Sequence, residues 1–403
     1  MASPDNSKAV LSIGLMLAAL SLAAIVSPAI VSSSSPSGKA YKEVVLHSFT
    51  LPPDGANPTA GLVLDESGNL YGVSFRGGAH HGGCVFKVDA SGQETVLYSF
   101  SNGGQEGRFP RGSLARDLAG NLFGTTSAGG TAGLGVVFKV DSTGQESVLH
   151  SFIGSPTDGA SPFGGLILDS AGNLYGTTTS GGTSNFGTIF KVDAAGSETV
   201  LYSFSGYPDG ANPFGGLARD ESGNLYGTTF YGGSYERCGG FGCGTVFKLD
   251  VTGKERVLHS FTSFDGNWPY AGLVLDTSGF LYGTAQEGGA HSSGTVFKLD
   301  TTGKFTTLFS FTGGADGGRP FAGVVRDDAG NLYGTTSRGG TTDSGVVFEL
   351  SPARKQTVLH SFTGLTDGAY PFAGVIADTA GNLYGTTEGG DPWRAGVVFK
   401  LAP

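Results

Sequence analysis

DGASPFGGLILDSAGNLYGTT at residues 158–178 and GTIFKVDAAGSETVLYSF at residues 187–204 together form the unit that decides the fold of this chain of 403 residues. Close copies of this unit return along the sequence, and the closing phenylalanine of the motif stands at positions 49, 100, 152, 204, 261, 311 and 362. A period near 50 residues is typical of arrays and propellers in which each copy is one supersecondary element. The sequence therefore predicts a single domain of seven repeats over residues 41–403.

Each copy contains four runs with strand character, which in the quoted copy cover residues 165–168, 173–177, 187–192 and 198–204. Turns separate them, since Asp169 and Asp193 can accept backbone N–H bonds and the glycines three residues later adopt left-handed conformations easily. Beyond the first 31 residues, no segment shows a sustained apolar period of 3.6. These features predict an all-β fold, a seven-bladed β-propeller with four antiparallel strands per blade.

The ends of the repeat region predict how the ring closes. The region begins at residues 44–49 with the string that elsewhere forms a fourth strand, and it ends at residues 396–401 with a third-strand string. The N-terminal strand is therefore expected to complete the last blade, which leaves no unpaired sheet edge. Small residues second and third after each repeat proline, such as Gly164 and Gly165, suit inner strands that converge on the axis.

Residues 1–40 differ in character from the repeats. Lys8 precedes an apolar run over residues 9–26, and a serine tract follows at residues 32–35. This pattern predicts a signal peptide or an uncleaved signal anchor with a Ser-rich linker, and hence an extracytoplasmic domain that contacts a membrane only if the anchor is retained. The net charge of −10 and the absence of basic runs argue against nucleic acid. A monomer is expected.

The strings GxVFKxDxxGxExVLHSF and DGxxPxxGLxxDxxGNLYGTT resemble the Gloeo/Verruco (GloVer) tandem repeat of choice-of-anchor type bacterial proteins. The resemblance covers roughly residues 42–401 and implies an exported protein, but it assigns no activity. The pattern PxxGLxxDxxGNLY is also similar to that of NHL-type and streptogramin-lyase-like propellers.

Residues that recur in every copy are interpreted as scaffold. The aspartate of the Asp-Gly pair, as in Asp158, is expected to form a turn, and one carboxylate per blade would not gather the six to eight oxygens that calcium needs. The histidine of VLHSF is interpreted as packing, because Phe309 replaces it in one copy. No metal site, cofactor or catalytic residue is assigned, since no nucleophile elbow, HExxH or phosphate loop is present.

Binding residues are expected where the copies differ. The loops from strand four to strand one and from strand two to strand three are expected on one face of the propeller, near the channel. Aromatic rings beside arginine suit either a sugar or a protein partner, whereas the aromatic residues that follow the repeat prolines could instead pack between blades. The candidates are Arg76, His81, Phe109, Arg111, Tyr231, Tyr235, Arg237, Trp268, Tyr270, Trp393 and Arg394.

Cys238 and Cys243 lie five positions apart in one enlarged loop and are predicted to form a disulfide, while Cys84 is interpreted as a partly buried thiol. The function expected from these features is a non-catalytic module that binds a polysaccharide or a protein on the loop face. A polysaccharide lyase or glycoside hydrolase on the same face is one alternative. A structural cell-surface protein without a discrete ligand is another.

Overall fold

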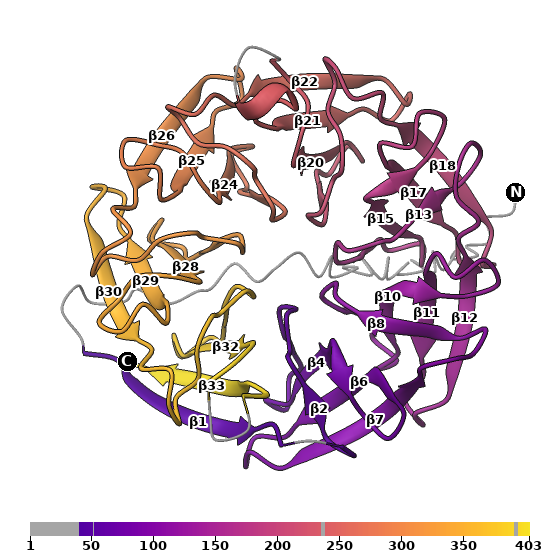
Figure 1. The fold of residues 1–403 in the computed structure, drawn as a ribbon, viewed down its shortest axis with the longest axis horizontal. Coiled ribbons are helices and arrows are strands. Elements are labelled where there is room, and N and C mark those ends of the chain that lie inside the picture. Colours follow the sequence, from indigo (N-terminus) through magenta and orange to yellow (C-terminus); the bar gives the residue numbers. More distant parts are fainter. Residues whose placement is uncertain (1–39, 51, 235–237, 391–393) are drawn as a thin grey trace, which may run out of the picture.

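The computed structural model describes residues 40–50, 52–234, 238–390 and 394–403. Seven antiparallel sheets stand around a central axis as the blades of a propeller (Figure 1). In the third blade, counted from the N-terminus, the strands from the axis outward are β14 (Ile167–Leu168), β15 (Leu174–Thr178), β17 (Thr188–Val192) and β18 (Glu198–Ser203). The predicted all-β, seven-bladed propeller is confirmed.

Five further blades follow the same order. Blade one has β3 (Val63–Leu64), β4 (Leu70–Ser74), β6 (His81–Val88) and β7 (Glu94–Ser101), and blade two has β9 (Ala115–Arg116), β10 (Leu122–Gly129), β11 (Val136–Val140) and β12 (Glu146–Ser151). Blade four has β19 (Ala218–Arg219), β20 (Leu225–Thr229), β21 (Thr245–Leu249) and β22 (Glu255–Ser260). Blade five has β23 (Val274–Leu275), β24 (Leu281–Ala285), β25 (Thr295–Leu299) and β26 (Phe305–Ser310), and blade six has β27 (Val325–Arg326), β28 (Leu332–Thr336), β29 (Val346–Leu350) and β30 (Gln356–Ser361).

The seventh blade joins the two ends of the chain. Its inner strands β31 (Ile376–Ala377), β32 (Leu383–Thr387) and β33 (Val397–Ala402) are followed by β1 (Lys42–Ser48), which pairs antiparallel with β33. Val45 lies opposite Phe399 in this pairing. The predicted closure by the N-terminal strand is therefore confirmed, and the seventh sheet has the same four strands as the others.

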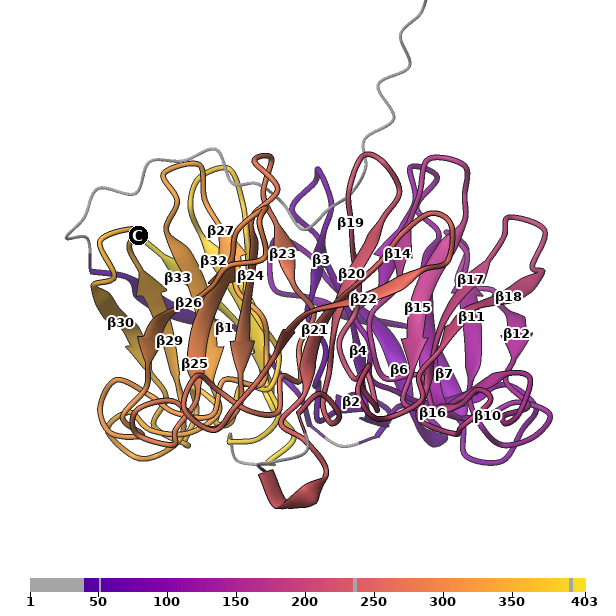
Figure 2. The ribbon, with the colours of Figure 1, turned by 90° about the horizontal axis from the view of Figure 1, so that it is seen from above.

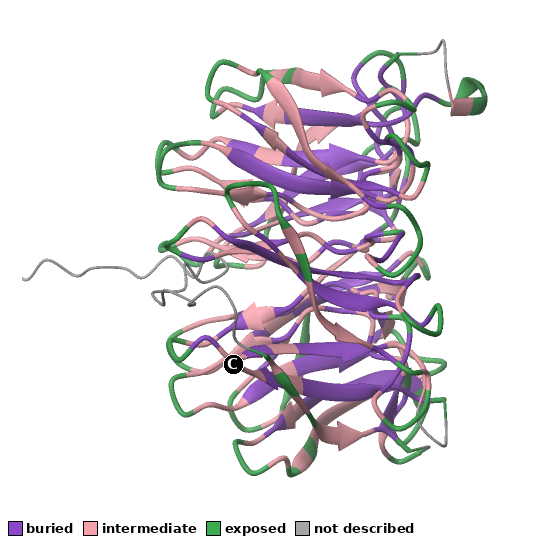
Figure 3. Cartoon of the chain, turned by 90° about the vertical axis from the view of Figure 1, so that its left-hand side faces the viewer, coloured by how far each residue is buried: buried purple, intermediate pink, exposed green. Residues whose placement is uncertain are grey.

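The repeated phenylalanines form the core between blades. Phe152, at the end of blade two, packs edge-on against Phe190 of blade three with ring centroids 5.1 Å apart. The closing junction repeats this contact between Phe49 and Phe86, at 5.0 Å, and all four side chains are fully buried. Gly176 is glycine because a Cβ there would lie 2.6 Å from Cζ of Phe190. Each copy of the repeat thus contributes one buried contact between two phenylalanine rings of neighbouring blades, within the buried strands of Figure 3.

Two local features differ from the sequence-based expectation. The innermost strand contains only two residues where four were expected, as in β14. The outermost strand carries a β-bulge, since the register passes from Ile189↔Tyr202 directly to Phe190↔Val200 and leaves Leu201 unpaired. A bulge increases the local twist of a strand and bends it. The same shift occurs in every blade, between its third and fourth strands.

The ring has two different ends. The connections from strand four to strand one and from strand two to strand three form one end, here called the loop face, and the tight hairpin turns form the other, here called the turn face. Short pairs such as β13 (Gly159–Ala160) with β16 (Ser180–Gly181) and β2 (Gly55–Ala56) with β5 (Arg76–Gly77) join the two kinds of loop, while β8 (Gly107–Pro110) extends blade two. The 3-10 turn η1 (Cys238–Gly240) projects from the loop face (Figure 2). Among the described residues, no helix is long and apolar enough to cross a membrane.

Candidate binding site at the mouth of the channel

A series of neighbouring side chains curves around the propeller axis at the loop face. The residue after the repeat proline contacts its counterpart in the next blade, and the successive ring or guanidinium separations lie between 4.7 and 5.5 Å. None of these side chains is fully buried, so each keeps a surface toward the channel. We call this set the aromatic belt, and we call the end of the propeller axis that it borders the mouth. The belt consists of Arg111, Phe163, Phe214, Tyr270, Phe321 and Phe372.

The packing between blades that the sequence allowed for these aromatic residues is observed, and their role in ligand binding stays a prediction. The aromatic residues do pack from blade to blade, as Phe214 does by stacking on Tyr270 at 4.7 Å with ring planes 16° apart. The rings also remain partly exposed, so part of each ring surface is accessible to a ligand. Blade one contributes Thr59 at the equivalent position, and its Oγ1 is buried without a hydrogen-bond partner. The belt is therefore an aromatic arc rather than a complete ring.

Arg111 is the charged member of the belt. Its guanidinium carbon lies 3.8 Å from the ring centroid of Phe75 and 5.0 Å from that of Phe163. Burial lowers the pKa of Arg111, although the side chain remains a cation at neutral pH. Within the described ranges, no hydrogen bond or ion pair uses its guanidinium. Two aromatic rings thus hold the cation in place while its donors stay uncommitted.

Three other polar groups face the same space. Burial raises the pKa of Glu388, and the charges of Arg111 and Arg76 act in the opposite direction. Burial also raises the pKa of Tyr270, and the charge of Arg111 opposes that rise as well. Tyr270 of blade five and Glu388 of blade seven both act on the pKa of Arg111 of blade two, so Arg111 is the group that these blades share. Arg76 is exposed, 5.6 Å from the ring centroid of Phe75.

A second aromatic group extends outward from the belt over blades four and five. Phe230 stacks on Trp268 with centroids 5.8 Å apart and contacts Tyr270 of the belt at 6.2 Å. Tyr231 contacts Phe230 at 4.7 Å and the 70% exposed Phe241 at 5.6 Å. The indole Nε1 of Trp268 is buried without a hydrogen-bond partner. These rings join the mouth to the enlarged loop of blade four.

The residue before each repeat proline has a left-handed backbone, with φ between 53° and 61°. Asn57 and Asn212 suit this conformation, and their side-chain amides each donate a hydrogen bond to a backbone carbonyl, at 2.9 and 2.8 Å. A bulky residue in this region is unfavourable, by about 1–2 kcal/mol for left-handed backbone. Trp268 and Phe109 therefore occupy these positions against the local backbone preference. The full set is Asn57, Phe109, Ser161, Asn212, Trp268, Arg319 and Tyr370.

The remaining candidates are placed less centrally. Phe109 lies 5.2 Å from Phe75 at the edge of the belt, whereas His81 and Arg394 are exposed and form no contact with it among the interactions found. Tyr235, Arg237 and Trp393 lie outside the described residues. Cys238 and Cys243 are joined by a disulfide with Cα atoms 5.3 Å apart. Cys84 is fully buried, and burial raises the pKa of its thiol to about 12, so this cysteine is unreactive.

Sequence reasoning missed Phe75, Phe230 and Glu388. All three occupy one repeat position, directly after the second residue of the Thr-Thr pair or its equivalent. A signal was present, because this position varies between copies as much as the residues flanking the prolines do. Its occupants are Phe75, Ser127, Thr179, Phe230, Gln286, Ser337 and Glu388.

Two carboxyl groups and a histidine come together at two of the blade junctions, a grouping that the sequence analysis did not foresee. His150 Nε2 lies 3.1 Å from Oδ2 of Asp158, and the Glu198 carboxyl of the neighbouring blade brings a third ligand atom, all within 4.8 Å of one another. The sequence hid this group because Glu198 belongs to the following copy. Burial and the charge of Asp158 raise the pKa of Glu198 to about 7. Asp158 still forms the turn as predicted, since it accepts bonds from the backbone N–H groups of Ile153 and Gly159.

The same group recurs at His47, Asp54 and Glu94, and the histidine–aspartate bond also joins His259 to Asp265 and His360 to Asp367. The histidine of VLHSF therefore pairs with the turn aspartate in addition to packing on phenylalanine. Because the histidine–aspartate bond repeats in four copies, it belongs to the scaffold and links the end of a fourth strand to the loop that follows it.

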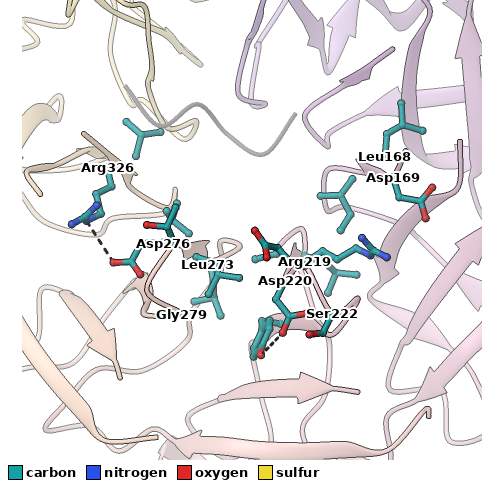
Figure 4. Close-up of a pocket in the computed structure, with 18 residues that line it drawn as sticks. Leu168, Asp169, Arg219, Asp220, Ser222, Leu273, Asp276, Gly279 and Arg326 are labelled. Carbon is teal, nitrogen blue, oxygen red and sulfur yellow. Dashed lines mark hydrogen bonds and ion pairs between the residues drawn. The ribbon is translucent and has the colours of Figure 1, made fainter. Parts of the chain in front are cut away.

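A cavity of about 380 Å³ opens at the turn face, between blades three and six (Figure 4). Its aspartates belong to the repeated hairpin turns, since Asp220 accepts bonds from the amide of Asn224 and the hydroxyl of Tyr226, at 2.7 and 3.0 Å. Arg326 of β27 lies 3.9 Å from Asp276. Arg219 of β19 also lines the cavity, and its Nε is buried without a hydrogen-bond partner, so this face too holds an arginine with an unused donor.

Fold and site together define a repeat-built β-propeller with an aromatic and charged mouth on one face. The chain belongs to the Gloeobacter/Verrucomicrobia repeat family, whose model matches residues 27–241 and 236–403. No curated protein matches the chain.

Solved structures with the same fold are distant in sequence. The extracellular domain of a protein described as a one-component system from B. thetaiotaomicron is 9% identical with a TM-score of 0.56, over 89% of this chain and 40% of that one. The chain thus spans less than half the length of that protein. A gluconolactonase from Xanthomonas campestris is 18% identical with a TM-score of 0.43, over 73% and 85% of the two chains. A luciferin-regenerating enzyme is 14% identical with a TM-score of 0.45, over 90% and 96%. At such identities the likeness shows the fold alone.

Proposed function

We propose that this chain is an exported, non-catalytic binding module that takes up a polysaccharide at the mouth of its channel on the loop face. The observation that carries the proposal is the aromatic belt with uncommitted polar groups above it. Aromatic faces stack on the apolar faces of sugar rings, and a few fixed polar groups then bind the hydroxyls. Arg111, Tyr270 and Glu388 supply such groups, and none of their side chains has a hydrogen-bond partner among the described residues.

A protein partner would use the same residue types, because Trp, Tyr and Arg dominate the energetics of protein interfaces. The belt favours a saccharide over a protein, because its partly exposed rings follow one another along an arc and can stack on successive sugar rings. Phe241, at the tip of the disulfide-closed loop, would instead suit a protein, and the test below includes that outcome.

A polysaccharide lyase or hydrolase is the second candidate. Glu388 supports it, because this carboxyl has no hydrogen-bond partner among the described residues and burial raises its pKa, the direction that suits a general acid. Turnover separates this candidate from simple binding, since only an enzyme releases unsaturated products or new reducing ends.

The test is a glycan array probed with the full chain and two variants. One variant carries Phe214→Ala and Tyr270→Ala in the belt, and the control carries Glu221→Gln at an exposed position on the turn face. We expect the wild type and the control to bind the same glycans, and the belt variant to lose at least tenfold in affinity. Equal losses in both variants, or capture of a protein but of no glycan, would contradict saccharide binding at the mouth. Product formation from a bound glycan would move the assignment to the enzyme.

Export is a separate part of the proposal, and it rests on the sequence pattern of residues 1–40. N-terminal sequencing of the protein recovered from expressing cells tests it. A mature N-terminus after residue 26 is expected if the segment is a cleaved signal, and an intact Met1 in a membrane fraction if it is an anchor. An intact Met1 in soluble cytoplasm would contradict export.

A further inference from the structure

We infer that the saccharide bound at the mouth is acidic, and that Arg111 binds the carboxylate of a uronic acid residue. This inference rests on the proposed function and names the ligand class for the same site.

The first argument is the state of the Arg111 side chain. Phe75 and Phe163 approach its guanidinium at 3.8 and 5.0 Å. A guanidinium held between rings keeps its N–H groups directed outward in its own plane, where two of them match the two oxygens of a carboxylate. No carboxylate of the described chain takes that place, since Glu388 influences Arg111 electrostatically but forms no ion pair with it. The arginine is thus pre-organised for an anion that the described residues do not supply.

The second argument is the local charge. The chain as a whole carries a net charge of −10. Around the Phe75 ring the described charges have the opposite balance, because Arg111 and Arg76 both lie near that ring and, of the described carboxyls, Glu388 is the one whose charge acts on Arg111. A positive site in an acidic protein selects anions and steers them toward the channel. A neutral glycan would gain nothing from this arrangement.

The third argument joins the charge to the belt. Phe163 contacts Arg111 on one side and Phe214 on the other, with ring centroids 5.3 Å apart in the second contact. A uronic acid with its carboxylate on Arg111 would therefore place its sugar ring, and the next residue of the polymer, along aromatic faces. The uncommitted hydroxyl of Tyr270 lies across the mouth to bind a sugar hydroxyl. A phosphate or sulfate would use the arginine equally well, but only a carbohydrate uses the arc of rings beside it.

The test is calorimetric titration of the full chain with oligogalacturonate and with its fully methyl-esterified form, in which each carboxylate is replaced by an uncharged methyl ester. We expect the wild type to bind the acid at least tenfold more tightly than the ester. Arg111→Gln should abolish this preference, so that the variant binds the acid and the ester with equal affinity. Arg338→Gln is the matched control, because Arg338 lies 4.8 Å from the Tyr370 ring centroid on the same face but outside the belt. Its preference should equal that of the wild type.

Equal affinity of the wild type for acid and ester would overturn the inference and leave the proposed function intact, provided that the belt variant loses binding. If neither saccharide binds, the inference is overturned, and the proposed function then stands or falls with the glycan array. Binding of a peptide through its C-terminal carboxylate, without binding of the uronate, would also overturn the inference. The comparison of acid with ester needs no substitution, so it remains decisive even if Arg111→Gln fails to fold.

Discussion

Glu198→Phe introduces a residue that the chain already has at the equivalent position of another blade. In blades three and five the same histidine–aspartate pair is present, but the residue beside it is Glu198 in one case and Phe305 in the other. Phe305 stacks on His259 with centroids 3.8 Å apart and planes at 11°. The substitution therefore removes a partly buried carboxyl and installs a ring that this scaffold already accommodates.

The expected effect depends on pH. Burial and Asp158 raise the pKa of Glu198 from 4.5 to about 7, so the folded chain binds this proton more tightly than the unfolded chain. The stabilisation from protonated Glu198 is fully present below pH 4.5, the unfolded value, and is lost as the pH rises through about 7. At 1.36 kcal/mol per pH unit the difference corresponds to roughly 3 kcal/mol. Partial exposure to solvent reduces this to about 1–2 kcal/mol.

The assay is chemical denaturation at pH 5 and pH 8. Wild-type stability should fall between the two, and Glu94, Glu146 and Glu255 contribute in the same direction because burial raises their pKa values to about 7 as well. Glu198→Phe should reduce the fall by about 1–2 kcal/mol, and Glu198→Gln should reduce it similarly without adding a ring. An identical fall in the wild type and both variants would refute the reasoning.

Three further predictions concern the fold and the loops. Phe49→Ala should lower the free energy of unfolding by about 3–5 kcal/mol, as should Phe152→Ala; a much smaller loss at Phe49 in denaturation would contradict ring closure. Trp268→Asn should leave the melting temperature unchanged or raise it, because asparagine suits the left-handed backbone seen at φ 59°, while glycan affinity falls; a variant that fails to fold would show that this ring is core. Reducing the disulfide between Cys238 and Cys243 should leave the ring folded, because the bond closes one loop of one blade; loss of the β-sheet signal in circular dichroism on reduction would contradict this.

The fold could be predicted because each of its determinants repeats. The equivalents of Phe152 and Phe190 recur at fixed spacing, so the packing at one blade junction predicts the packing at all of them. The repeat region begins with a fourth-strand string at residues 44–49 and ends with a third-strand string at residues 396–401, which predicts how the ring closes. The bulge at Leu201 could not be predicted in the same way. It arises from the pairing of the outer strand with its neighbour, and the sequence pattern of a bulged strand is the same as that of a regular one.

The site could be predicted only in part, because its residues come from different blades. The variation around the repeat prolines pointed to Arg111 and Tyr270 separately, but their convergence depends on the radius of the ring. Glu388 was accessible to the same reasoning, since its repeat position also varies. The contact of Glu198 with His150 was hidden because the two residues belong to different copies of the repeat.

Tryptophan fluorescence tests the central claim, that the loop-face mouth binds the ligand, most directly. The chain has two tryptophans, and in a Trp393→Phe variant the remaining fluorophore is Trp268, which stacks on Phe230 beside the belt. Titration with an oligosaccharide selected on the glycan array should change the emission of Trp268 with the same affinity that calorimetry gives. Calorimetric binding with no change in Trp268 emission, and with full affinity in the Phe214→Ala and Tyr270→Ala variant, would contradict the account.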